Sequence, residues 1–461
     1  MIEGLKPYAK YKESEIPWAP AIPSSWKTER AKRLFTKMQR PVRPEDDVVT
    51  CFRDGMVTLR KNRRLRGFTE ATAFSGYQGI RKGDLVIHGM DAFAGAIGVS
   101  DSDGQGTPVY NVCKPRPGVI ASYYAYTVRE MSRAQWILAL AKGIRERSTD
   151  FRYEMFGNQF VPLPPLDEQA AIVRFLDHAN RKIDGFIRAK RKLIGLLNEQ
   201  KQAIIHRAVT RGIDTDIELK PSGVNYLGDI PKHWNVAPAR AVFTEVIERG
   251  HPKEQMLSVT IRRGIITQSQ LLENSIKKDS SRQDKAAYKL VCVGDIAYNK
   301  MRAWQGAFGV SDLQGIVSPA YVVVRSKSLA DIRFYHYLFR TPTFASEAER
   351  WSYGIASDMW SLRPEHFRLI KLPIPPETEQ NAIGMHLDRE LVNYNAAIAR
   401  TEREIIIMQE YRTRLIADIV TGKLDVRDTA ANLPDEFLLE VTDGPIDLGD
   451  KVDFTDEEID A

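Results

Sequence analysis

The chain has 461 residues, of which 43% are hydrophobic and 27% are charged, a composition typical of a folded protein with room for two or more domains. Its longest apolar runs, such as residues 405–408, are far too short to cross a bilayer, so a membrane protein is not expected. The three cysteines are isolated and fit neither a disulfide framework nor a metal site. We expect a cytoplasmic protein.

The net charge of +6 is unevenly distributed along the chain. Residues 431–461 carry eleven acidic side chains and one lysine, so residues 1–430 carry a net charge of +16. A body this basic favours a polyanionic partner, although charge alone is equally compatible with a merely soluble basic protein. We predict that residues 429–461 form an acidic, mobile tail.

Residues 1–155 have the texture of a mixed α/β module. Short runs of β-branched and aromatic residues, such as 84–88 and 108–112, predict strands between Gly- and Pro-containing turns. Residues 60–66 place five positive charges in seven positions, which is typical either of a solvated loop or of a DNA-binding loop. The candidate DNA contacts of this cluster are Arg60, Lys61, Arg63, Arg64 and Arg66.

A long helix is predicted within residues 156–214. Pro164-Pro165 and the acidic Asp167-Glu168 are helix start signals, and more than 40 residues without proline follow. The apolar residues of this stretch recur mainly at steps of three and four, which indicates a coiled-coil seam. The predicted seam residues are Ile172, Leu176, Ile183, Leu193, Leu197 and Ile204.

The rest of the chain repeats the first half about 211 residues later. Gly83-Asp84-Leu85 matches Gly294-Asp295-Ile296, and the same offset pairs Glu168-Gln169 with Glu379-Gln380. A period this long exceeds the roughly 50 residues of solenoid repeats, so it indicates a duplicated domain. We expect a second module at 215–365 and a second long helix within 366–428. Its predicted seam residues are Ile383, Leu387, Tyr394, Ile405, Met408 and Leu415.

The predicted fold is therefore mixed α/β, with two tandem modules joined by two long helices that form an antiparallel coiled coil with pseudo-twofold symmetry. A single long helix cannot bury its apolar stripe alone, which favours pairing of the two helices. The alternative is that each helix packs onto its own module.

A further pair of candidate DNA-binding segments, one in each module, follows a predicted strand. Met90 and Met301 are shared between the copies, which indicates an architectural role for part of the segment. Its neighbours differ between copies and are better candidates for reading different sequences. The candidates here are His88, Asp91, Asn299, Lys300, Arg302, Trp304 and Gln305, together with Arg262 and Arg263 elsewhere in the second module.

Motifs that carry catalysis are missing from the sequence. It has no Gly-rich phosphate loop ending in Gly-Lys-Ser/Thr, no dinucleotide-binding fingerprint and no metal-ligand spacing among its eight histidines. This favours a recognition or scaffold component over an enzyme.

Several of these motifs together resemble the specificity (S) subunit of type I DNA restriction-modification systems. The resemblance rests on residues 299–310 followed by Gly315–Tyr321, on the two Pro-Pro-x-x-Glu-Gln helix starts, on the helix ends at Val209-Thr210 and Val420-Thr421, and on the linker 220–234. It covers roughly residues 12–428 and leaves the acidic tail outside.

The resemblance implies a non-catalytic subunit with two target recognition domains, each reading one half of a bipartite, asymmetric site on double-stranded DNA. The helices would space these domains and dock methyltransferase (M) subunits, two in number, and restriction (R) subunits would join the larger complex. S-adenosylmethionine, ATP and Mg would then belong to the partner subunits, with no cofactor and no metal in this chain. The alternative is a coiled-coil scaffold or adaptor that does not bind DNA.

Overall fold

The computed structural model describes residues 5–63, 76–141, 150–261, 263–272, 285–328, 332–354 and 360–434. The chain divides into two compact units, and each contains one end of both long helices. Among the described residues, unit 1 consists of those within 5–189 and 403–434, and unit 2 of those within 190–402. The predicted domain boundaries at residues 155, 214, 365 and 428 stay predictions.

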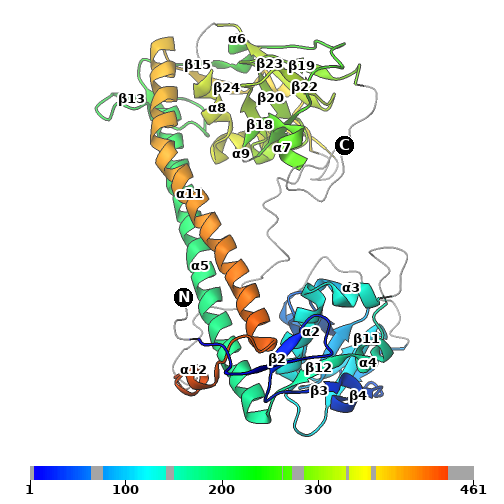
Figure 1. Ribbon diagram of the computed structural model, residues 1–461. Helices are drawn as coiled ribbons and strands as arrows, with labels where there is room; N and C mark the ends of the chain where they lie inside the picture. The colour runs from blue at the N-terminus through cyan, green and yellow to red at the C-terminus, as the bar shows by residue number, and fades with distance from the viewer. Residues whose placement is uncertain are drawn as a thin grey trace. The chain divides into compact units, whose positions relative to one another are not determined.

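Unit 1 is built on a four-stranded antiparallel sheet in the order β4-β11-β8-β9, accompanied by two-stranded sheets (Figure 1). Its strands are β1 (Tyr11–Glu13), β2 (Ala21–Pro23), β3 (Lys27–Arg30), β4 (Phe35–Met38), β5 (Val49–Cys51), β6 (Val57–Leu59), β7 (Gln78–Ile80), β8 (Leu85–His88), β9 (Ile97–Val99), β10 (Gly104–Gly106), β11 (Tyr110–Pro115) and β12 (Phe160–Leu163). Its shorter helices are α1 (Ala31–Leu34), η1 (Arg60–Asn62), η2 (Ala92–Ala94), α2 (Ala121–Arg133), α3 (Trp136–Leu140), α4 (Tyr153–Asn158) and α12 (Arg427–Ala431).

Unit 2 repeats this topology, with its four-stranded sheet in the order β16-β23-β20-β21. Its strands are β13 (Leu219–Pro221), β14 (Asp229–Pro231), β15 (Asn235–Pro238), β16 (Phe243–Glu245), β17 (Leu257–Thr260), β18 (Gly264–Thr267), β19 (Lys289–Val291), β20 (Ile296–Asn299), β21 (Phe308–Val310), β22 (Gly315–Val317), β23 (Tyr321–Ser326) and β24 (Lys371–Ile374). Its shorter helices are α6 (Ala239–Val242), α7 (Gln268–Leu272), η3 (Ala303–Gln305), α8 (Arg333–Phe339), α9 (Pro342–Arg350) and α10 (Pro364–Phe367).

The two units differ in the helix that follows the last strand of the four-stranded sheet, β11 in unit 1 and β23 in unit 2. In unit 1 this helix, α2, runs for 13 residues, whereas in unit 2 it stops after the seven residues of α8. Pro342 is the reason, because proline lacks an N–H and belongs at the first position of a helix. Thr341 caps the new helix α9 by accepting a hydrogen bond from the Phe344 amide at 3.2 Å.

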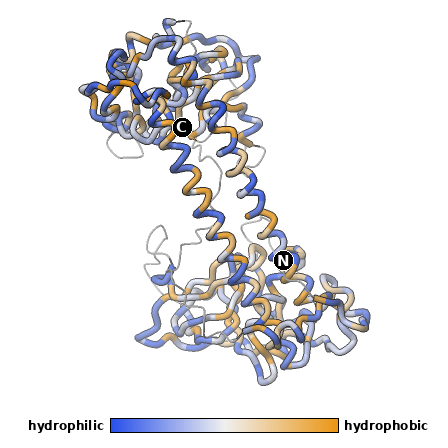
Figure 2. The backbone as a smooth tube through the Cα atoms, turned by 90° about the vertical axis from the view of Figure 1, so that its left-hand side faces the viewer, coloured by the Kyte–Doolittle hydropathy of each residue, from blue (hydrophilic) through white to orange (hydrophobic). Residues whose placement is uncertain are grey.

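Two helices of more than 40 residues, α5 (Leu166–Arg211) and α11 (Glu377–Val420), confirm the predicted long helices. They run antiparallel. In unit 1, Asp184 of α5 forms an ion pair with Arg412 of α11. In unit 2, the Lys201 ammonium donates to Asn395 Oδ1 at 2.7 Å. Hydrophobic and hydrophilic residues alternate along each helix, so each can bury one stripe (Figure 2).

The ends of the long helices also pack into the core of the module beside them. In unit 1, Ile172 and Leu176 of α5 and Ile419 of α11 join one apolar cluster with Trp26 and Tyr124. In unit 2, Val209 of α5 and Ile383 and Leu387 of α11 join the corresponding cluster with Trp234. Helix pairing and packing onto the module, which we treated as alternatives, therefore occur together.

Most predicted seam positions are buried or half-buried. Ile172, Leu176, Ile183, Ile383, Leu387, Ile405 and Leu415 are buried, while Leu197, Ile204, Tyr394 and Met408 are half-buried. Leu193 departs from the expectation, because it is 40% exposed while the adjacent Ile194 is half-buried. About two turns earlier it is Ile187 that is buried, so the buried stripe of α5 passes one residue beside the predicted seam here.

Candidate nucleic-acid interface

The strand-to-3₁₀ turn after β8 in unit 1 and after β20 in unit 2 has the same backbone geometry in both units. The His88 amide donates to Ala96 O at 3.0 Å, and its counterpart Asn299 donates to Ala307 O at 3.1 Å. Each turn ends in a glycine with positive φ, +90° at Gly95 and +87° at Gly306. A residue with a Cβ rarely adopts this conformation, which explains the glycine in both copies.

His88 and Asn299 hold these turns through their side chains. The Asp91 amide donates to His88 Nδ1 at 3.2 Å, and the Met301 amide donates to Asn299 Oδ1 at 3.0 Å. Burial lowers the pKa of His88, so the ring is neutral and can accept this bond at neutral pH. Both residues thus have an architectural contact, and their predicted contact with DNA stays a prediction.

The remaining side chains of the two turns differ in charge and in partners. Asp91 forms an ion pair with Arg53 at 3.0 Å, so the turn of unit 1 presents a paired carboxylate. At the same position in unit 2, Arg302 donates to Gln305 Oε1 at 3.1 Å. Trp304 donates its indole N–H to Met301 O at 3.0 Å and meets Trp360 edge to face. One backbone frame therefore carries two different sets of polar groups.

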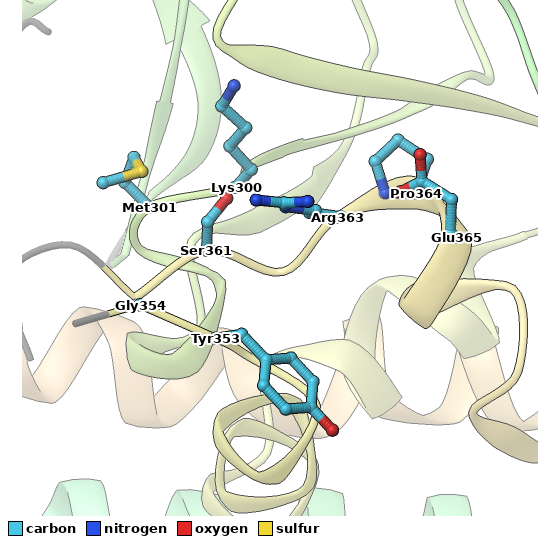
Figure 3. Close-up of a pocket in the computed structure, with 8 residues that line it drawn as sticks. All are labelled: Lys300, Met301, Tyr353, Gly354, Ser361, Arg363, Pro364 and Glu365. Atoms are coloured by element: carbon cyan, nitrogen blue, oxygen red, sulfur yellow. The ribbon is translucent and has the colours of Figure 1, made fainter.

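The segment before α10 lies against the turn of unit 2, and the two together line an open cavity. The Leu362 amide donates to Lys300 O at 2.9 Å and joins the two segments. The cavity has a volume of about 580 Å³ and is lined by Lys300, Met301, Tyr353, Gly354, Ser361, Arg363, Pro364 and Glu365. Figure 3 shows Lys300, Ser361 and Arg363 as neighbours along the cavity, with the Lys300 side chain extending away from the other two and the ring of Tyr353 directed away from all three.

Sequence reasoning named Lys300, which lines this cavity, but did not name Arg363, Ser361 or Tyr353, which line it too. A signal was available, because Arg152 and Glu154 of the first copy match Arg363 and Glu365 at the offset of 211 residues. These positions were overlooked since they are about 60 residues away from the turn along the chain. Only the fold brings them to it.

The basic cluster at 60–66 is partly neutralised by its own module. The Lys61 ammonium pairs with Asp47 at 2.5 Å, and Arg63 pairs with Asp54 at 2.7 Å while its guanidinium stacks on Phe52. Arg60 Nε lies 3.4 Å from Thr50 Oγ1. Arg64 and Arg66 lie outside the described residues, as does Arg262, while Arg263 is exposed on the turn before β18.

The described ranges show no cluster of three or more His, Cys, Asp or Glu side chains able to hold a metal ion. Two cysteines, Cys51 and Cys113, are buried, and burial raises the pKa of both thiols. None of the helices within those ranges combines the length and the apolar character that a membrane crossing requires.

The chain, with two α/β modules of one topology and two paired long helices, is similar in sequence to type I restriction enzyme specificity subunits and in fold to a chain of a type I R-M system. The type I restriction enzyme MjaVIII specificity subunit of Methanocaldococcus jannaschii is 25% identical over 293 residues, or 60% of this chain and 64% of that protein. The putative type I restriction enzyme MjaX specificity subunit of the same organism is 22% identical over 356 residues, covering 76% of this chain and 75% of that protein.

Among solved structures, a chain from work on complex assembly and conformational transition of the type I R-M system superposes with a TM-score of 0.60. The superposition covers 87% of this chain and 99% of that chain at 14% sequence identity, so it establishes the fold. No family model matches the chain. The similarity to the MjaVIII subunit spans just under two thirds of the length of that relative.

Proposed function

We propose that the chain is the DNA sequence-specificity subunit of a type I restriction-modification complex and that it acts in the cytoplasm without catalytic activity of its own. Each module reads one half of a bipartite, asymmetric site on double-stranded DNA. Reading requires polar side chains that reach base edges from a fixed backbone, whereas contacts to phosphates fix the position of the protein.

The observation that carries this proposal is the shared turn with unlike side chains. The backbone hydrogen bonds and the left-handed glycine are the same after β8 and β20. Asp91 in one copy corresponds to Arg302 in the other, and Ala94 corresponds to Gln305. A duplicated frame with different hydrogen-bonding groups is what two unlike half-sites require.

The long helices provide surfaces for partner subunits. Several large apolar side chains of α11 remain more than half exposed, namely Met385, Val392, Ile406 and Ile407. Apolar residues this exposed on a paired helix favour a protein partner. We assign this role to two methyltransferase subunits, with restriction subunits joining the complex. S-adenosylmethionine, ATP and Mg are cofactors of those partners.

Methylome sequencing tests the proposal. The chain is co-expressed with its methyltransferase partner in a host that lacks other adenine methylation. We expect N6-methyladenine at one bipartite, asymmetric motif, and none when the chain is omitted. Absence of such a motif in the presence of both proteins would contradict the proposal and would favour a scaffold that does not bind DNA.

Exchange of the second module tests the division of labour. Residues 223–365 are replaced by the corresponding module of a related subunit with a different motif. Only one half of the methylated motif should change, since each module reads its own half. A change in both halves would show that the modules do not read independently.

A further inference from the structure

Arg152 of unit 1 and Arg363 of unit 2 occupy the same backbone position. Each immediately precedes a short helix, α4 or α10, with extended backbone angles of −81° and 161° in one case and −73° and 154° in the other. The residue before each arginine donates the same hydrogen bond to the turn, from Phe151 to Gly89 O at 3.0 Å and from Leu362 to Lys300 O at 2.9 Å. The two arginine side chains therefore leave equivalent points of the two modules.

The two arginines differ in their neighbours. In unit 1, Arg152 Nε donates to the carboxylate of Asp150 at 2.5 Å, and this pair is exposed. The counterpart of Asp150 in unit 2 is Ser361, which removes the carboxylate. In the part of the chain that the structure describes, neither the Arg363 guanidinium nor the Lys300 ammonium forms a hydrogen bond or an ion pair. Glu365 lines the same cavity without pairing with either cation.

The groups around Arg363 suit a phosphodiester. Arginine and lysine neutralise phosphate charge, and a serine hydroxyl donates to phosphate oxygens. Lys300, Ser361 and Arg363 line one open cavity of about 580 Å³ and come from the two segments that flank it (Figure 3). An arginine at the same place in both modules is unsuited to distinguish two unlike half-sites, but it is suited to hold the backbone of both.

We propose that Arg363 binds a backbone phosphate beside the second half-site, assisted by Lys300 and Ser361, and that Asp150 weakens the equivalent contact of Arg152 in the first module. The inference rests on the proposed DNA recognition and adds to it an electrostatic difference between the modules. The second module holds the duplex backbone more strongly. The aspartate-to-serine difference between the two copies sets this asymmetry.

The salt dependence of binding tests the inference. The full-length chain, purified with its methyltransferase partner, is titrated against a labelled duplex that carries the motif found by methylome sequencing. Each neutralised phosphate contributes about −0.9 to the slope of log K against log salt. Arg363→Gln should therefore make this slope less negative by about 1. Between about 50 and 200 mM salt, wild type should lose about 3.5-fold more affinity than this variant.

Three further variants separate charge from fold. Arg363→Lys keeps the charge and should retain the wild-type slope. Ser361→Asp recreates in unit 2 the carboxylate that unit 1 has, so it should make the slope less negative, as Arg363→Gln does. Asp150→Ser releases Arg152 from its ion pair and should make the slope more negative. Arg363→Gln should also weaken binding to the same extent on duplexes with base changes in either half of the motif, because a phosphate contact carries no base information.

Slopes that stay at the wild-type value in both Arg363→Gln and Ser361→Asp would overturn the inference. Relaxed discrimination at a single base pair in Arg363→Gln would also overturn it, since that result assigns Arg363 to base reading. In both cases a wild-type complex that still prefers its motif over a duplex without the motif leaves the proposed function intact. A wild-type complex without any such preference contradicts the proposed function itself.

Discussion

The indole N–H of Trp26 donates a hydrogen bond to the carboxylate of Glu168 at 2.8 Å, and the Tyr8 hydroxyl donates to the same oxygen. Glu168 lies in the first turn of α5 and is buried. Burial raises the pKa of Tyr8 well above its usual range, so the hydroxyl remains a donor at neutral pH. In unit 2 the corresponding Glu379 faces His233 at 2.7 Å instead, and the indole N–H of Trp234 has no partner within the described residues.

Removal of the Glu168 carboxylate should therefore destabilise unit 1. Glu168→Ala leaves two buried donors without an acceptor, and each such donor costs about 1–3 kcal/mol. We expect a loss of about 3 kcal/mol in the free energy of unfolding, measured by hydrogen exchange of unit 1 amides. Glu379→Ala is the matched control and should cost about 1 kcal/mol or less, because its partner is half exposed. Equal losses in both variants would contradict this difference.

Gly98 should tolerate no side chain. A Cβ at this position would lie 1.9 Å from the carbonyl oxygen of Gly55, so the strand or the loop must move. We expect Gly98→Ala to cost about 3 kcal/mol or more, measured by urea denaturation. Gly185 in α5 is the control, since a Cβ there meets only the end of the Arg188 side chain at 4.0 Å. Gly185→Ala should leave stability unchanged or raise it by up to about 1 kcal/mol.

The buried stripe of the long helices can be mapped by truncation to alanine. Ile383 is fully buried in the core of unit 2, so Ile383→Ala should cost about 2–4 kcal/mol. Leu193 is 40% exposed, so Leu193→Ala should lower the free energy of unfolding by no more than about 0.5 kcal/mol. Thermal unfolding of the two variants checks the ranking. A large loss of stability in Leu193→Ala would show that Leu193 belongs to the buried seam, as its spacing in the sequence predicts.

His336 makes the stability of unit 2 depend on pH. The Nδ1 atom of His336 accepts a hydrogen bond from the Val310 amide at 3.2 Å, and Arg340 Nη1 lies 3.0 Å from its Nε2. The neutral ring therefore carries its proton on Nε2, and a second proton would have to go on Nδ1, where it would meet the amide donor. Burial, followed by the Arg340 charge, lowers the pKa of His336 to about 3 from 6.5, and Asp388 opposes this shift. The unfolded chain therefore binds more protons than the folded one between these values. Stability is complete above pH 6.5 and falls as the pH drops toward 3.

Urea denaturation at about pH 7.5 and about pH 5.5 measures this effect. Over this interval wild type should lose about 1.4 kcal/mol more than His336→Ala, in which the titrating ring is gone. Alanine is a reasonable replacement, since Ala125 occupies the equivalent position in unit 1. The same pH dependence in both proteins would show that His336 is not responsible.

Much of the fold could be predicted from the sequence because the chain repeats itself. Residues that impose a backbone conformation, such as Gly95 and Gly306, recur at one spacing, and both copies adopt the same turn. The long helices were identifiable by their start signals and by an apolar period that persists for more than 40 residues. Side-chain partners were not identifiable in this way.

Asp84 and Asp295 illustrate the reason. They stand at equivalent positions after Gly83 and Gly294, and both are buried. Asp84 pairs with Arg40, which follows β4, whereas Asp295 is held by Arg325 of β23 through two bonds of 2.7 and 2.8 Å. The cation lies after β4 in unit 1 and on β23, the counterpart of β11, in unit 2. No local pattern says which of these two segments supplies it.

The sequence by itself determined the duplication, the mixed α/β class, the two long helices and the basic body, since each follows from local conformational preferences or from composition. The tertiary structure alone decided which residue of α5 faces the partner helix near Leu193, which cation neutralises each buried aspartate, and that Arg363 reaches the turn of unit 2. These are relations between segments far apart in the chain. They depend on helix rotation and strand register, which are set by packing and not by the spacing of residues along the chain.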